Sequence, residues 1–220
     1  ALSGVRVKIC GIRKEEDILA AVEAGADYLG FVVGVPISPR NLPVEAARRL
    51  MKNVPDPVRK VVVTIKAFDN AKMLSFLIRA LSPDVIQLHG DGLTIPASIR
   101  KNFPEVMFLG SLPIRDESLP VALSMSRVFD GIHADSYARD FRGGTGVTHD
   151  WKKSARVRDL IAPKPLTLAG GLTQDNVAEA VRVVRPFAVD VSTGVESSPG
   201  AKDHHKIVEF IRRAKEVSFH

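Results

Sequence analysis

Residues 5–33 read VRVKICGIRKEEDILAAVEAGADYLGFVV, and this stretch decides the fold class. Both of its ends are rich in β-branched and aromatic residues, as strands are. Between them Ile18, Ala21 and Val22 keep the spacing of one helix face, and Gly25 follows as the residue that ends the helix. Two strands joined by a helix predict a βαβ unit, in which the strands are parallel.

The same unit recurs along the chain. Strand-like runs occur at Val5–Ile9, Tyr28–Val33, Lys60–Ile65, Val85–Leu88, Val106–Leu109, Val128–Ile132, Leu166–Leu168 and Phe187–Val191. Helical spacing lies between them, around residues 18–25, 44–53, 74–81, 94–102, 115–126, 152–162, 177–184 and 207–214, with Thr173 and Asp203 as candidate N-caps of the last two. This alternation predicts an α/β fold, a (β/α)8 TIM barrel.

A doubly wound open sheet is the alternative arrangement of parallel strands. Its usual glycine-rich turn is absent, because the turn after the first strand reads Cys10-Gly-Ile-Arg-Lys14. Residues 1–220 contain no linker and no low-complexity tract. We therefore expect one single catalytic domain over residues 1–220.

Composition limits the classes of function. Hydrophobic residues make up 45% of the 220 residues, which excludes a disordered chain, and the longest apolar runs are too short to span a membrane. A single cysteine excludes internal disulfides and suits a reducing, cytoplasmic location. The net charge of +6 favours anionic partners, either a phosphorylated small molecule or nucleic acid. Aromatic residues (6%) do not interleave with the basic ones, so we expect no nucleic-acid binding.

Two residues at strand ends are candidates for acid–base catalysis. In a barrel the site lies where strands end and βα loops begin. Cys10 ends the first strand, and its thiol can act as a general base if a positive charge lowers its pKa; the alternative is a small buried apolar residue. Asp135 follows the sixth strand, where an aspartate can also cap a turn. The glycines Gly143 and Gly144 come soon after it, in a stretch of lid-like composition.

Two loops late in the chain have the composition of phosphate-binding loops. Gly170 and Gly171 follow the seventh strand, and Ser192, Thr193 and Gly194 follow the eighth. Small residues let backbone N–H groups approach an anion, and barrels often bind phosphate in these two loops. Each loop alone is also compatible with an ordinary turn, but together they predict a phosphate site.

Three further polar residues lie at strand ends. Arg40, after the second strand, can clamp a carboxylate with two hydrogen bonds, or it can be a surface arginine on a proline-stiffened loop. Gln87 and His89, at the end of the fourth strand, either line the pocket or cap a turn. The histidines show no metal-ligand spacing, so we expect no metal.

These pieces occur in the order found in one family. The motifs are Lys8-Ile-Cys-Gly-Ile12, Gly25-Ala-Asp27 with Gly30-Phe31, Ser38-Pro-Arg40, Gln87-Leu-His-Gly-Asp91, Gly143-Gly-Thr-Gly146, Leu168-Ala-Gly-Gly-Leu172 and Asp190-Val-Ser-Thr-Gly-Val-Glu-Ser-Ser-Pro-Gly200. From residue 7 to about residue 211, the chain resembles the phosphoribosylanthranilate isomerases of tryptophan biosynthesis.

The resemblance implies a (β/α)8 barrel that uses no cofactor and is a monomer or a homodimer. It implies an Amadori rearrangement of N-(5-phosphoribosyl)anthranilate to 1-(o-carboxyphenylamino)-1-deoxyribulose 5-phosphate. By position, Cys10 would be the general base, Asp135 the general acid and Arg40 the contact of the anthranilate carboxylate. The phosphate would lie on Gly170, Gly171, Ser192, Thr193 and Gly194.

The chain departs from the expected family pattern near Asp135. Ala134 stands where Leu or Val is expected, and Asp130 and Asp140 are the other carboxylates close to this strand. Related barrel enzymes remain alternatives: indole-glycerol-phosphate synthase would need a lysine acid at a strand end, and the histidine-pathway isomerase paired aspartates on the first and fifth strands. A barrel that has lost catalysis and only binds its ligand is a further alternative.

Overall fold

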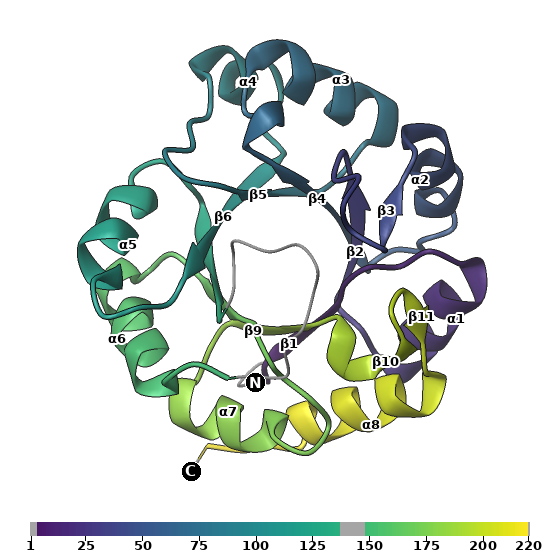
Figure 1. Cartoon of the computed structure of the whole chain (residues 1–220), viewed down its shortest axis with the longest axis vertical. Coiled ribbons are helices and arrows are strands. Elements are labelled where there is room, and N and C mark those ends of the chain that lie inside the picture. The colour runs from purple at the N-terminus through teal and green to yellow at the C-terminus, as the bar shows by residue number, and fades with distance from the viewer. Residues whose placement is uncertain (1–3, 137–147, 220) are drawn as a thin grey trace.

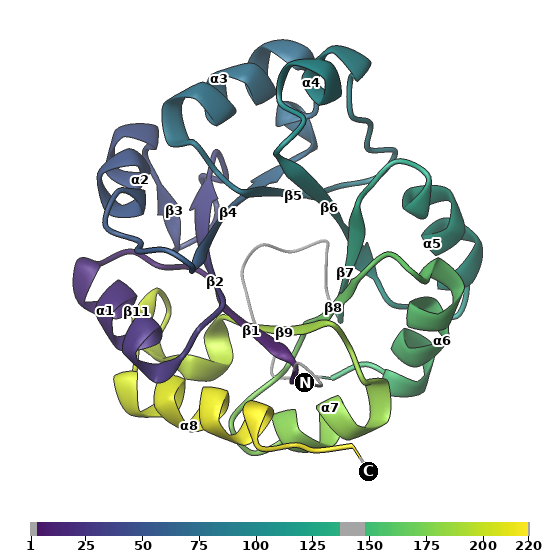
Figure 2. The same cartoon turned by 180° about the vertical axis from the view of Figure 1, so that it is seen from behind.

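Parallel strands close into a barrel, with helices outside it (Figure 1). This computed structural model describes residues 4–136 and 148–219. In these residues the sheet order is β1-β9-β8-β7-β6-β5-β4-β2, and a β1–β2 pairing closes the ring. The predicted (β/α)8 barrel is confirmed, and Figure 2 shows the same ring of helices from behind.

The strands are β1 (Arg6–Ile9), β2 (Tyr28–Val33), β3 (Asn41–Leu42), β4 (Arg59–Ile65), β5 (Val85–His89), β6 (Met107–Pro113), β7 (Gly131–Asp135), β8 (Leu166–Leu168), β9 (Ala188–Val191), β10 (Glu196–Ser198) and β11 (Ala201–Lys202). The α-helices are α1 (Glu15–Ala24), α2 (Val44–Met51), α3 (Ala71–Leu81), α4 (Ala97–Asn102), α5 (Ser118–Ser126), α6 (Trp151–Ile161), α7 (Val177–Val184) and α8 (His204–Lys215). Short 3-10 turns occupy Lys66–Phe68 and Thr193–Val195.

Strand β5 shows why the barrel wall is buried on both faces. Ile86 and Leu88 belong to the apolar core that also contains Leu74 and Leu77 of α3. Gln87 between them is equally buried, but its side chain contacts Lys8 of β1 inside the barrel. Successive side chains of a strand point to opposite faces, so one face packs on helices and the other fills the interior.

Helix ends follow the local chemistry of the sequence in two of three cases. Gly25 ends α1 at φ +99°, and its N–H donates to the carbonyl of Ala21. Asp203 caps α8 by accepting from the N–H of Lys206 at 3.1 Å, as predicted. The predicted cap Thr173 is wrong, because α7 begins only at Val177, and Thr173 lies in the preceding turn.

The sixth strand lies further along the chain than its composition predicts. The run Val128–Ile132 overlaps β7 by only two residues, since the strand is Gly131–Asp135. Phe129 packs in the core beneath α5, and the Asp130 carboxylate accepts from the Phe108 N–H at 2.8 Å. Apolar composition here marks core packing before the strand, and the shift brings Asp135 into β7 itself.

No helix in residues 4–136 or 148–219 is long and apolar enough to cross a membrane.

Candidate active site

Cys10 lies directly after β1, where this strand meets the neighbouring β9. Its N–H donates to the Val191 carbonyl at 2.9 Å, and the residue is 8% exposed. Gly30 leaves room for the thiol, because a Cβ at that position would lie 2.7 Å from Sγ. Burial raises the pKa of the Cys10 thiol, and the positive charge of Lys8 opposes that rise. The thiol is therefore largely protonated in the free protein at neutral pH.

Asp135 is the last residue of β7 and is half-buried. A Cβ at Gly170, in the loop after β8, would lie only 2.7 Å from the Asp135 Oδ1 atom. The carboxylate is thus placed against the first predicted phosphate loop. Because β8 and β9 separate β7 from β1, Asp135 and Cys10 end strands on either side of both phosphate loops.

Asp130 is not placed to replace Asp135. It precedes β7, at the other end of the strand, and its carboxylate accepts from Arg100 at 2.8 Å. Asp140 lies outside the described residues, as do Gly143 and Gly144.

The two predicted phosphate loops lie against each other. Gly170 and Gly171 have φ values of +92° and +68°, and a Cβ at Gly194 would overlap the carbonyl oxygen of Leu172. Only glycine adopts such backbone and allows such contact without strain. The Asn176 amide donates to the Gly171 carbonyl at 3.0 Å and holds the first turn.

Ser192 and Thr193 complete this region. Both are half-buried, and Thr193 begins a 3-10 turn that ends at Val195. The sequence prediction placed Gly170, Gly171, Ser192, Thr193 and Gly194 in two loops of one site, and the structure brings these loops together.

Buried polar side chains lie in the barrel interior below the strand ends, and Val32, Val61, Val63 and Val85 belong to a separate apolar cluster with Cys10. The Lys8 ammonium donates to Asp190 Oδ2 at 3.0 Å and to Gln87 Oε1 at 2.7 Å. His133 Nε2 lies 2.7 Å from the same Asp190 oxygen, so this nitrogen carries the proton and donates it. Ser111 Oγ lies 3.2 Å from His133 Nδ1. We call these residues, together with His89, the interior polar layer.

The charges of the interior polar layer compensate one another. Burial alone would raise the pKa of the Asp190 carboxyl, but Lys8 and the His133 hydrogen bond outweigh it and hold that pKa below its ordinary value. Burial, with His133 and Lys8, lowers the pKa of His89 well below its ordinary value. His89 is therefore neutral at physiological pH, and it accepts from the Gln87 amide at 2.8 Å.

Gln87 and His89 thus lie inside the barrel and are buried, and their role in lining a substrate pocket stays a prediction. The sequence analysis assigned no role to Lys8, His133 or Asp190, although Lys8 and Asp190 begin two of the motifs. A signal was available, because residues two apart on a strand face the same side. Lys8 precedes Cys10 by two positions, and His133 precedes Asp135 by two.

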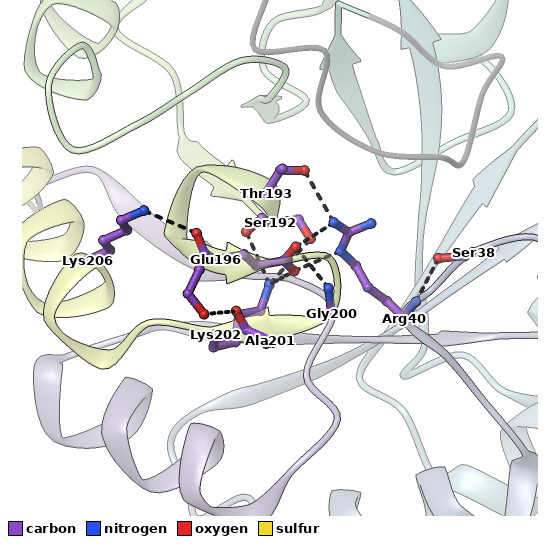
Figure 3. Close-up of polar contacts among 10 residues, drawn as sticks. Ser38, Arg40, Ser192, Thr193, Glu196, Gly200, Ala201, Lys202 and Lys206 are labelled. Carbon is purple, nitrogen blue, oxygen red and sulfur yellow. Dashed lines mark hydrogen bonds and ion pairs between the residues drawn. The ribbon is translucent and has the colours of Figure 1, made fainter.

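Arg40 is buried and already paired. Its Nε and Nη2 atoms donate to the Glu196 carboxylate at 2.8 and 2.5 Å, and Nη2 also approaches Thr193 Oγ1 at 3.4 Å (Figure 3). The residue is 4% exposed, which excludes the surface alternative. Glu196 and its second cation, Lys202, were not anticipated as members of the site.

No group of three or more His, Cys, Asp or Glu side chains suited to a metal ion occurs among the residues that the structure describes. The arrangement offers a thiol, a carboxylic acid, two adjoining glycine-containing loops and a buried guanidinium. These groups can transfer protons and bind anions.

Comparison with known proteins agrees with this architecture. Residues 7–213 match the family described as N-(5'phosphoribosyl)anthranilate (PRA) isomerase. An N-(5'-phosphoribosyl)anthranilate isomerase of Halorubrum lacusprofundi is 41% identical over 210 residues, covering 95% of this chain and 96% of that protein.

Solved structures give the same result. The crystal structure of phosphoribosyl anthranilate isomerase from Thermotoga maritima has a TM-score of 0.83 at 37% identity, covering 97% of this chain and 100% of that one. A phosphoribosyl anthranilate isomerase in complex with reduced 1-(o-carboxyphenylamino)-1-deoxyribulose 5-phosphate has a TM-score of 0.79 at 36% identity, with the same coverage. The chain belongs to the N-(5'-phosphoribosyl)anthranilate isomerase family.

Proposed function

We propose that this protein converts N-(5-phosphoribosyl)anthranilate to 1-(o-carboxyphenylamino)-1-deoxyribulose 5-phosphate in tryptophan biosynthesis, as one catalytic domain over residues 1–220. The observation that carries the proposal is the family match over residues 7–213 in a chain that places Cys10 and Asp135 at the ends of β1 and β7. The enzyme would act in the cytoplasm, as a monomer or a homodimer.

The two anionic ends of the substrate are assigned to two anchors. The loops of Gly170, Gly171, Ser192, Thr193 and Gly194 would hold the phosphate through backbone N–H groups and hydroxyls. The guanidinium of Arg40 would hold the anthranilate carboxylate, since Nη1 has no partner among the described residues. Gln87, His89, Gly143 and Gly144 remain predicted substrate-binding residues.

The first chemical step would be ring opening. Asp135 donates a proton to the ring oxygen, the bond between C1 and that oxygen breaks, and the nitrogen lone pair forms an iminium at C1. A carboxylic acid can do this at neutral pH if its surroundings keep it partly protonated. The half-buried position of Asp135 against the Gly170 loop, close to the phosphate anchor, supports this role.

The second step would be proton removal at C2. The Cys10 thiolate takes the C2 proton, and the electron pair of that bond neutralises the iminium to give an enolamine. Protonation at C1 and loss of the proton on the C2 oxygen then give the aminoketose. The positive iminium favours the thiolate, and so offsets the burial that raises the pKa of Cys10. Both steps are proton transfers, and their chemistry requires no metal or organic cofactor.

The test follows the loss of anthranilate-type fluorescence when the protein meets freshly generated phosphoribosylanthranilate. Cys10→Ala and Asp135→Asn should each lower kcat by about 10²–10⁴-fold, the usual contribution of one acid–base group. Their affinity for reduced 1-(o-carboxyphenylamino)-1-deoxyribulose 5-phosphate should change little. Asp130→Asn is the matched control, because it removes a carboxylate at the other end of β7 and should leave kcat unchanged.

A large rise in KM at unchanged kcat in Cys10→Ala would contradict the base assignment. Lack of conversion by the unmodified protein, despite binding of the reduced product analogue, would overturn the proposed reaction while leaving the anion site in place.

A further inference from the structure

A buried cluster of three charged side chains supports the Arg40 side of the site. Arg40 lies in the loop between β2 and β3, Glu196 begins β10, and Lys202 ends β11 (Figure 3). Their side chains are 5%, 1% and 0% exposed. Burying charges is unfavourable unless they are paired with good geometry, so such a cluster is seldom neutral to function or stability.

Glu196 determines how the Arg40 guanidinium is oriented. The carboxylate accepts from Nε and Nη2 at 2.8 and 2.5 Å, which is the two-point pairing of one edge of the guanidinium. That pairing fixes the plane of the group and leaves Nη1 on the far edge, with no partner among the described residues. A second carboxylate can then bind through Nη1 and through Nη2, where the Thr193 hydroxyl contact is long at 3.4 Å.

Glu196 is itself held from its other side. Its Oε2 atom accepts from Lys202 Nζ at 2.8 Å, and its Oε1 atom accepts from the Gly200 N–H at 3.2 Å. Burial would raise the pKa of Glu196, but the hydrogen bond from Arg40 and the charge of Lys202 together lower it, so the carboxylate is ionised. The hairpin of β10 and β11 thus presents a fixed negative charge to Arg40.

Lys202 links the same cluster to the predicted phosphate loop. Its Nζ atom donates to the Ser192 carbonyl at 3.2 Å and approaches Ser192 Oγ at 3.4 Å. A hydroxyl that accepts from an ammonium keeps its own proton available for another acceptor. The cluster therefore contacts both predicted anion anchors, and its charges sum to +1 before any ligand binds.

We propose that Glu196 is a positioning residue, which holds the guanidinium of Arg40 in the orientation that binds the carboxylate of the substrate. The inference rests on the proposed function. Without Glu196, the neighbouring cations Arg40 and Lys202 would share one buried space unpaired, and Arg40 would lose both its fixed plane and its free edge. Both carboxylate oxygens of Glu196 already accept hydrogen bonds within the chain, so we expect its effect on the carboxylate of the ligand to act through Arg40.

The experiment compares two ligands that differ in one group. The first is reduced 1-(o-carboxyphenylamino)-1-deoxyribulose 5-phosphate, and the second is its phenylamino counterpart without the carboxyl group. Glu196→Gln keeps the shape of the side chain but removes its charge. It should weaken binding of the first ligand by roughly tenfold or more and that of the second by less than about threefold. Glu45→Gln, which breaks the exposed Glu45–Arg48 pair, is the matched control and should change neither.

A merely structural role for Glu196 predicts a different result. Under a structural role, Glu196→Gln would weaken binding of both ligands equally or of neither, and either outcome would overturn the proposal. A second measurement adds Glu196→Gln to Arg40→Met. If Glu196 acts through Arg40, the double variant should bind the carboxylated ligand as tightly as Arg40→Met alone. An additive loss of affinity would contradict the proposal.

Glu196→Asp gives the same test if Glu196→Gln does not fold, because the shorter carboxylate keeps the charge and loses the two-point geometry. Failure of the proposed function is recognised separately. In that case the unmodified protein does not convert phosphoribosylanthranilate and does not bind the carboxylated ligand more tightly than its counterpart. If the unmodified protein does both and the Glu196 variants retain full discrimination, only the positioning role is wrong.

Discussion

The thiol of Cys10, the proposed general base, is buried at the end of β1. Its sequence position, at the end of a strand, was enough to nominate it. The sequence did not show that Lys8 and Asp190, side chains of opposite charge from β1 and β9, lie close enough to act on its pKa. Burial has the largest effect and raises that pKa.

The pH dependence of turnover follows from this direction. In Asp135→Asn no carboxylic acid titrates, so the residual kcat/KM should follow the proposed Cys10 thiolate alone; because the pKa of Cys10 is above its ordinary value, it should rise with pH through the alkaline range and level off only above that pKa. The rise in kcat should lie at lower pH, since the bound iminium favours the thiolate. Steady-state rates of Asp135→Asn between pH 6 and 10 test this, and a flat kcat/KM of this variant between pH 7 and 9 would contradict it.

His149 gives a pH dependence of stability rather than of catalysis. Its ring nitrogens lie 2.8 Å from Ser136 Oγ and 2.5 Å from Ser154 Oγ, so it ties the end of β7 to α6. Burial, partly opposed by Asp150, lowers the pKa of His149 to about 4. The unfolded chain takes up this proton near the ordinary pKa of about 6.5.

The free energy of unfolding should therefore fall as the pH drops from about 6.5 to about 4, and the loss should stop below that pH. The contribution is at most about 3.5 kcal/mol, at roughly 1.4 kcal/mol for each pKa unit. His149→Gln removes the titration, so its unfolding free energy in urea should depend less on pH than that of the unmodified protein. Equal pH dependence in the two proteins would show that His149 is not the group responsible.

Among the elements, the loop after β8 packs its backbone directly against Asp135, the predicted general acid. Gly170 has a φ of +92°, and a Cβ there would overlap Ser136 and lie 2.7 Å from Asp135 Oδ1. Gly25, at the end of α1, has a similar φ of +99°, but a Cβ there would meet nothing nearer than Ile211, at 3.8 Å. Substitution of Gly25 therefore introduces backbone strain alone, whereas substitution of Gly170 introduces strain and steric overlap.

Gly25→Ala should lower the unfolding free energy by about 1–2 kcal/mol, the cost of a left-handed conformation for an L-residue, with activity unchanged. Gly170→Ala should cost more than this and should also lower kcat/KM, because Ser136 and Asp135 must move. Thermal unfolding and the fluorescence assay give both quantities. Similar stability and full activity for the two variants would contradict the close packing of Gly170 against Asp135.

Among the elements, the composition of the sequence predicted where most strands and helices lie, but tertiary packing determined the residues at which they begin and end. Runs such as Tyr28–Val33 coincide with their strand, because a β-branched and aromatic stretch bounded by polar residues has no competing arrangement. Val128–Ile132 misled, since Phe129 is apolar for packing beneath α5 and not for pairing. Thr173 misled because the turn that shapes the glycine loop continues to Asn176 before α7 begins.

For the whole molecule, the interior polar layer joins strands that are distant in the sequence. Lys8 and Asp190 are 182 residues apart, and their side chains are 3% and 7% exposed. Together with His133 they link β1, β9 and β7, the strands that carry Cys10, the second predicted phosphate loop and Asp135. The layer therefore connects the strands of the two predicted catalytic groups to the strand that precedes the second predicted phosphate loop.

Breaking this pair should be costly. Asp190→Asn leaves the buried Lys8 ammonium without its counter-charge and should lower the unfolding free energy by about 3–5 kcal/mol. Adding Lys8→Met should restore part of the loss, because no uncompensated charge is then buried. Urea unfolding of the single and double variants measures both effects. A small loss in Asp190→Asn, comparable to that of the exposed control Glu45→Gln, would contradict the role of this layer.

The sequence by itself determined the barrel, the family and the strand-end residues Cys10 and Asp135. These follow from local periodicity and from short motifs, because both depend only on residues that are close together along the chain. Only the tertiary structure decided that Glu196 is paired with both Arg40 and Lys202, and that Lys8, His133 and Asp190 meet inside the barrel. Apart from the pair Glu196–Lys202, which lies within one hairpin, those contacts join residues 57 to 182 positions apart in separate βα units. The charge states of the carboxylates depend on these distant partners, so no local pattern predicts them.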